Sequence, residues 1–210
     1  MPLSFDGAGT ITGLQVGGLP DGTVDLDTLA AASVNNAKLA AGTPDAAALP
    51  SGTALQIVTN NFTDVFSITS GEDTFVDVTG FSGVLNPIAS GNKVLVMCQV
   101  GRAGAANNGG RLTNFRLTKN GTGFAVPPAA GSRQLASFSC ISTDTPYNNG
   151  GGVIFMDSTD GTTTVNYQVQ MMNQAGGETT RINTAGNDND SSDAPYARTV
   201  SSITLIEIAG

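Results

Sequence analysis

Short apolar segments recur from Ala54 to the end of the chain at a spacing of roughly ten residues, separated by connections rich in glycine and asparagine. In residues 165–171 apolar and polar residues alternate with a period of two, as in a strand with one buried and one solvated face. Another such segment ends at Asn120-Gly121, a pair typical of two-residue hairpin turns. The pattern predicts an all-β fold, an antiparallel β-sandwich or jelly roll.

The segments that we predict as strands are residues 55–59, 65–68, 75–78, 93–100, 112–117, 134–140, 153–156, 163–172 and 200–208. Residues 93–100 begin with apolar side chains on both faces, which fits a sheet that packs on its own core and on a neighbouring subunit. A closed threefold assembly covers such a second face. We therefore predict a homotrimer.

The N-terminal quarter of the chain differs in composition from the remainder. Eleven of the twelve aromatic residues follow residue 60, and the first 50 residues carry five Asp against a single Lys. Such a segment buries too little apolar area to offset its ordering entropy, so it should fold only on a partner or along copies of itself. We predict an extended N-terminal attachment arm at residues 1–53 and a head domain at residues 54–210.

Residues 26–41 of the arm predict one short Ala-rich helix, with Asp25 or Asp27 as its N-cap and Gly42-Thr43-Pro44 as its end. Its narrow apolar stripe is too thin for a core, but it allows close packing in a bundle. The alternative is that the helix lies on its own head domain. The residues that we predict to make the attachment are Leu14, Leu19, Leu26 and Leu29.

Charge and the lack of histidine narrow the function classes. Seventeen acidic and nine basic residues give a net charge of −8, which argues against nucleic-acid or anionic-membrane binding through bulk electrostatics. Without histidine there is no Ser–His or Cys–His nucleophile pair and no His-ligated zinc. Since no stretch of 18 apolar residues is present, we expect no membrane insertion. We also expect no enzymatic activity and no cofactor.

Two groups of carboxylates are candidates for a metal site or an acid/base pair. Residues 188–193 hold three Asp, which suits Ca²⁺, but Asp193 stands where an EF-hand loop needs Gly and Thr199 stands where it needs Glu. A solvated loop is the interpretation we favour. Glu72-Asp73 with Asp77 would form an acid/base pair only if the fold brought another carboxylate opposite. Cys98 and Cys140 fall in predicted core strands, and we expect free thiols and no structural disulfide.

Six segments carry a family resemblance: GTITGL (9–14), GGLPDGTV (17–24), LQIV (55–58), TFVDVTG (74–80), NKVLV (92–96) and SITLIEIA (202–209). Together they resemble fibre-like virion structural proteins of marine and cyanobacterial tailed phages. The resemblance implies a trimeric appendage of the virion, assembled in the host cytoplasm. It also implies an N-terminal arm that attaches to another virion protein and a jelly-roll head of C1q or TNF type. It supplies no active-site residues.

Two Gly- and Asn-rich segments, residues 102–111 and 147–152, are predicted as exposed loops. Their Asn, Gly and Tyr residues suit adaptable recognition, so the loops would form a tip that binds a host surface glycan or protein. Plain mobile loops and β-turns are the interpretation that we favour, and tip recognition is the alternative. The tip residues are Arg102, Asn107, Asn108, Arg111, Tyr147, Asn148 and Asn149.

The function that we predict from the sequence is a trimeric tail-fibre or receptor-facing appendage of a tailed phage, anchored by its arm. A capsid decoration protein, in which the arm or head clamps neighbouring capsid subunits, is the alternative. A glycan depolymerase is a distant third.

Overall fold

The computed structural model describes residues 4–5, 11–12, 49–69, 73–106, 111–144, 147–159, 161–174 and 177–210. The chain divides into two units, Met1–Asp45 and Ala46–Gly210. In the first unit, strands β1 (Ser4–Phe5) and β2 (Ile11–Thr12) pair antiparallel. The helix predicted at residues 26–41 lies outside the described residues, as do the four attachment residues Leu14, Leu19, Leu26 and Leu29.

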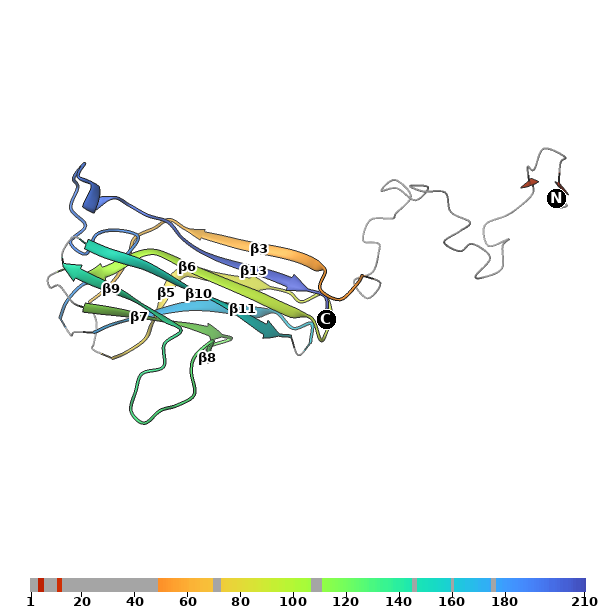
Figure 1. Ribbon diagram of the computed structural model, residues 1–210, viewed down its shortest axis with the longest axis horizontal. Coiled ribbons are helices and arrows are strands. Elements are labelled where there is room, and N and C mark those ends of the chain that lie inside the picture. The colour runs from red at the N-terminus through yellow and green to blue at the C-terminus, as the bar shows by residue number, and fades with distance from the viewer. Residues whose placement is uncertain are drawn as a thin grey trace. The chain divides into compact units, whose positions relative to one another are not determined.

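The second unit, called the head below, is built from β-strands (Figure 1). They are β3 (Ala54–Phe62), β4 (Phe66–Ile68), β5 (Val76–Leu85), β6 (Lys93–Ala105), β7 (Arg111–Lys119), β8 (Thr122–Phe124), β9 (Phe138–Asp144), β10 (Tyr147–Ser158), β11 (Val165–Asn173), β12 (Thr180–Ile182) and β13 (Ser201–Ile208), with one 3-10 turn, η3 (Ala194–Tyr196). All described strand pairs are antiparallel. The prediction of an all-β antiparallel domain is confirmed.

The main path of the sheet runs β3-β13-β6-β10-β9-β7-β11-β5, and β4, β8 and β12 pair at its margins. Strand β10 joins the two halves, because Tyr147 and Asn148 pair with β9 whereas residues 149–158 pair with β6. The strands β3-β13-β6-β10 form one layer and the strands β9-β7-β11-β5 form the other (Figure 1).

The two ends of this path, β3 and β5, lie side by side. Side-chain amides join them: Asn60 Nδ2 donates to the carbonyl oxygens of Gly80 and Ser82 at 2.9 Å each, and Gln56 Nε2 donates to Asn86 O at 2.7 Å. The sheet is therefore nearly closed into a barrel-like shape.

The core lies between the two layers and follows the predicted period of two. Alternate residues of β6, β13 and β11 are buried and meet there, namely Val94, Val96, Cys98, Val100, Ile203, Leu205, Val165, Tyr167, Val169 and Met171. Two stacked ring pairs extend the core, Phe62 with Phe81 (centroids 5.1 Å apart) and Phe115 with Phe138 (4.9 Å). Each large apolar side chain buried in this way contributes about 1.5–3 kcal/mol, so the head has the core that the arm composition lacks.

Strand β5 is interrupted by a bulge. Four of its residues, 78–81, stand opposite a single residue of β11. Gly80 adopts a φ of +84°, a left-handed conformation open to glycine at no steric cost. Gln168 Nε2 donates to Val78 O (2.8 Å) and Phe81 O (3.3 Å), so this side chain satisfies carbonyl groups that the bulge takes out of the ladder.

Several predicted strands and loops have other bounds in the structure. The strand predicted at 134–140 begins later, at Phe138. Residues 147–152, predicted as an exposed loop, are the first half of β10. Their glycines serve close strand packing instead of a turn: a Cβ on Gly152 would lie 2.4 Å from Cys98 O.

Candidate functional site

Arg102 positions loops at one end of the head. This end lies opposite Ala54 and Gly210 (Figure 1), and we call it the distal end. This residue was predicted in an exposed loop, but it lies in β6 and is 8% exposed. Its Nη1 donates to Pro195 O and Ala197 O at 2.9 Å each, which fixes the η3 turn. Burial lowers the pKa of Arg102. The Arg102 guanidinium is therefore part of the framework under the distal loops.

Asn183 ties strands of the same end together. It is fully buried and has a φ of +65°, a left-handed conformation that Asn tolerates better than most residues. Its Nδ2 donates to Phe62 O (2.8 Å) and Asp64 O (3.0 Å), and its Oδ1 accepts from Ser201 Oγ (2.6 Å). One side chain thus joins the end of β3 to the start of β13 and positions the loop that follows β12.

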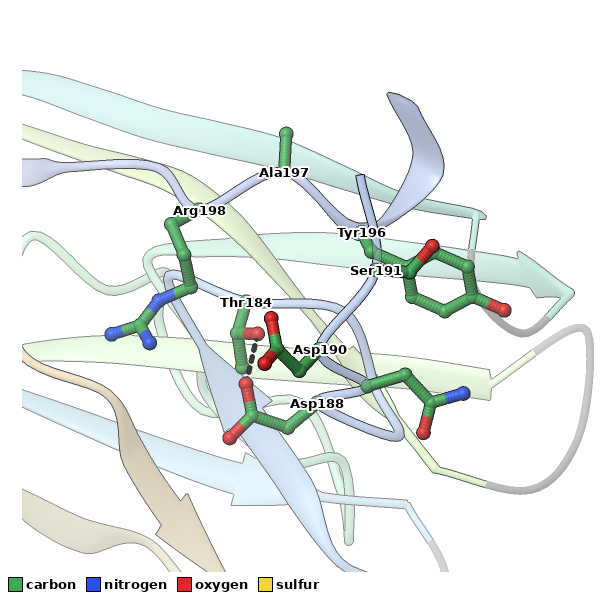
Figure 2. A pocket seen from close by; sticks show the side chains of 8 residues that line it. Thr184, Asp188, Asp190, Ser191, Tyr196, Ala197 and Arg198 are labelled. Carbon is green, nitrogen blue, oxygen red and sulfur yellow. Dashed lines mark hydrogen bonds between the residues drawn. The ribbon is translucent and has the colours of Figure 1, made fainter. Parts of the chain in front are cut away.

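That loop and the η3 turn enclose a pocket of about 420 Å³, called the distal pocket below (Figure 2). Its lining residues are Thr184, Asp188, Asn189, Asp190, Ser191, Tyr196, Ala197 and Arg198. Thr184 Oγ1 donates to Asp188 Oδ1, which orients that carboxylate. In Figure 2 the Asp190 carboxylate lies between the Tyr196 ring and the Arg198 guanidinium. The wall of the pocket therefore carries hydrogen-bond acceptors, a cationic donor and an aromatic ring.

A second hollow of about 310 Å³ is lined by Gly101, Arg102, Tyr147, Asn148, Asn149, Ala194, Pro195 and Thr199. It includes four of the predicted tip residues, Arg102, Tyr147, Asn148 and Asn149. Tyr147 is 58% exposed, whereas the amide of Asn148 packs against Gly104 and lies 3.2 Å from Ser142 Oγ. The chain segment 194–199 contributes to both hollows, with residues 196–198 lining the distal pocket and residues 194, 195 and 199 lining the second hollow.

Of the remaining tip residues, the structure describes Arg111, which lines neither hollow. Arg111 begins β7, and its Nη2 lies 3.7 Å from Glu178 Oε1. Asn107 and Asn108 lie outside the described residues. Sequence reasoning missed Thr184, Tyr196 and Arg198, which no motif marks. It did single out the acidic segment that contains Asp188 and Asp190, as a solvated loop.

The outer surface of the β3-β13-β6-β10 layer is a second candidate site. Register places twelve residues there in three rows of four: Ile57, Ile206, Leu95 and Met156; Thr59, Thr204, Met97 and Ile154; Asn61, Ser202, Gln99 and Gly152. None is charged. Ile57 is 65% exposed and Ile154 is 69% exposed. We call these twelve residues the uncharged face. Its first row is apolar, its second row is mixed and its third row holds polar residues and Gly152.

The two cysteines and Asp77 are the other candidate groups that the structure describes in detail. Cys98 and Cys140 are free and buried, and burial raises the pKa of each thiol to about 12, with the neighbouring Cys140 adding to the effect on Cys98. Thiols held protonated in this way are poor nucleophiles. Asp77 accepts from Gln170 Nε2 at 2.7 Å, and Glu72 lies outside the described residues.

The described residues contain no group of three or more His, Cys, Asp or Glu side chains placed to hold a metal ion. In that part of the chain, no helix has the length and apolar character to cross a bilayer. No protein-family model matches the sequence, and no curated protein is significantly similar to it.

Proposed function

We propose that this chain is a structural protein of a tailed-phage virion, a homotrimeric appendage whose head projects from an N-terminal attachment arm. The observation that carries the proposal is the uncharged face. A solvent-facing side of an antiparallel layer normally carries polar and charged residues, and contiguous apolar surface of this kind marks a site of association.

A second copy of the chain is the occupant that fits the uncharged face. Apolar exposure continues around residues 149–158 of β10, which pair with β6 and form the edge of this layer. There Phe155 points to the opposite side from Ile154 and is 45% exposed. A face and an edge are different surfaces, so contact between them is heterologous, the type of contact from which closed rings are built. A ring of three agrees with the resemblance to trimeric phage proteins described above.

We also propose that the head is a jelly roll of C1q or TNF type, as in these phage proteins. The support is the pairing of its eight long strands. The first pairs with the eighth (β3 with β13), the second with the seventh (β5 with β11), the third with the sixth (β6 with β10) and the fourth with the fifth (β7 with β9). This is the order of one long hairpin rolled into two four-stranded sheets.

A charge placed on the uncharged face tests the assembly. Ile57→Lys and Ile206→Lys should convert a trimer into a monomer, because each buries an unpaired ammonium in the contact. Val84→Lys is the matched control, because Val84 is 50% exposed on a strand of the opposite layer. Light scattering after size exclusion reads the result. If the two face variants keep the mass of the control, the uncharged face is not the interface.

Attachment to the virion is tested by removing residues 1–50. We expect the remaining head to stay soluble and to melt cooperatively, since the described core lies within it, but no longer to join particles. Leu29→Asp in the full chain should weaken incorporation in the same direction. Circular dichroism of the truncated chain and immunogold labelling of virions measure the two effects. Label on the tail supports the receptor-facing role, label on the capsid supports the decoration role, and an absence of label contradicts both.

A further inference from the structure

The distal pocket holds charged groups that the fold itself does not use. Arg102 and Asn183, which build this end, are buried and bonded to backbone oxygens. Asp190 and Arg198, by contrast, are exposed, and within the described part of the chain neither forms an ion pair. Exposed side chains that stabilise nothing around them, gathered at a preformed hollow, are available to a ligand.

The chemistry of the pocket selects among ligand classes. Two carboxylates, Asp188 and Asp190, against one guanidinium, Arg198, leave a net charge of −1, which disfavours an anionic ligand. The described residues offer no set of three ligands for a metal ion. Polar groups line most of the wall, so a purely apolar ligand would leave them without partners. A neutral ligand rich in hydroxyl groups fits, because carboxylates accept O–H donors and a guanidinium donates to hydroxyl oxygens.

The Tyr196 ring and the volumes of the two hollows narrow the class of ligand further. Tyr196 presents an amphipathic ring beside the polar groups (Figure 2), a surface suited to the C–H face of a sugar. Volumes of about 420 Å³ and 310 Å³ lie at the small end of the range for ligand sites. Tyr147 gives the second hollow an exposed aromatic ring of its own. The segment 194–199 contributes 196–198 to the distal pocket and its flanking residues 194, 195 and 199 to the second hollow.

We propose that the distal end of the head binds a neutral oligosaccharide, with one sugar unit in the distal pocket and an adjoining unit at Tyr147. In the pocket, Asp188 and Asp190 accept hydroxyl protons, Arg198 donates to a hydroxyl or ring oxygen, and Tyr196 stacks on the sugar ring. The inference rests on the proposed function for its biological setting: in an appendage the distal end lies opposite the point where the chain enters β3 and faces outward.

Saturation-transfer NMR on the full chain tests the proposal. The probes are glucose, galactose, mannose, rhamnose and N-acetylglucosamine with their di- and trisaccharides, and glucuronic acid serves as an anionic comparison. We expect saturation of ring C–H protons for at least one neutral series, with tighter binding of the longer members. Tyr196→Ala and Asp190→Asn should weaken that binding at least tenfold. Asp193→Asn is the matched control, because the Asp193 carboxylate belongs to the same loop and forms no cap bond to η3. This variant should leave sugar binding unchanged.

Several results would overturn the proposal. These are no transfer to any neutral sugar at millimolar concentration, equal effects of Asp193→Asn and Asp190→Asn, preference for glucuronic acid, and loss of binding on addition of EDTA. The mass of each variant, measured on the same samples, separates this proposal from the proposed function. Lost sugar binding with an intact trimer concerns the distal pocket alone, whereas a monomeric wild-type chain contradicts the assembly itself.

Discussion

Glu207 is a carboxylate in the middle of the last strand, and it is completely buried. Its Oε1 accepts from Ile88 N (2.8 Å) and from Asn92 Nδ2 (2.6 Å), and its Oε2 accepts from Gln56 Nε2. No ion pair joins it to a Lys or Arg of the described residues. Three donors therefore take the place of a cation and bind the end of β13 to β3 and to the β5–β6 connection.

Glu207→Gln keeps the shape of this side chain but supplies one acceptor oxygen and one NH₂ group. In either orientation of the new amide, a donor faces a donor. Gln56 cannot relieve the conflict by rotating its own amide, because its Nε2 also donates to Asn86 O at 2.7 Å. One buried donor is left without a partner and the charge assistance to the others is lost, which together cost about 3 kcal/mol.

Thermal unfolding followed by circular dichroism measures the loss. For a domain of this size, about 3 kcal/mol corresponds to a fall in Tm of about 6–12 °C. Asp64→Asn neutralises an exposed carboxylate and should change Tm by less than about 2 °C, since surface substitutions cost at most about 0.5 kcal/mol. If Glu207→Gln has the same Tm as the wild type, the hydrogen bonds assigned to Glu207 do not stabilise the head.

The remaining predictions concern packing, the distal end and the thiols. Gly152→Ala should lower Tm strongly, because its Cβ would meet Cys98 O at 2.4 Å, whereas Gly161→Ala, with open space around it, should be nearly neutral; a similar Tm for the two would contradict the close approach of β10 to β6. Asn183→Ala should cost about 3 kcal/mol by leaving the Phe62 and Asp64 carbonyls and the Ser201 hydroxyl without their partner, and urea unfolding measures it. Cys98 and Cys140 should resist a thiol reagent at pH 8 until the head unfolds, because burial raises the pKa of both to about 12. Since unfolded thiols ionise near pH 9 and the folded ones stay protonated, stability should fall as the pH rises from about 9 toward 12, and a flat profile in a Cys-to-Ala comparison would refute this.

The strands that sequence predicts best are those with one buried and one wet face. In β11 the residues from Val165 to Met171 alternate between buried and more exposed positions, and the same alternation of apolar and polar residues is visible in the sequence. The first half of β10 is missed because glycines that allow close strand packing have the same composition as glycines that form turns. Glu207 interrupts an apolar strand and gives a local signal of a buried polar site, but its three donors come from distant segments.

The candidate sites are harder to predict from the sequence than the strands are, because they depend on strand register and on contacts between distant loops. The uncharged face combines residues from four strands that alternate with core residues, so its lack of charge emerges only when the strands are aligned. The distal pocket brings Thr184 together with Arg198 through two loops that share no motif. Arg102 begins a Gly-rich run, which predicts an exposed recognition residue. Its burial and its hydrogen bonds to two carbonyl oxygens depend on the tertiary fold and have no signal in the local sequence.

The mass of the full chain in solution tests the central claim most directly. Three copies of a 21.2 kDa chain give about 64 kDa, the closed ring in which the uncharged face is covered. Light scattering at micromolar concentration should return that value, and it should not change on dilution through the micromolar range. A monodisperse species of 21.2 kDa would contradict the proposed trimer and leave the uncharged face without its occupant.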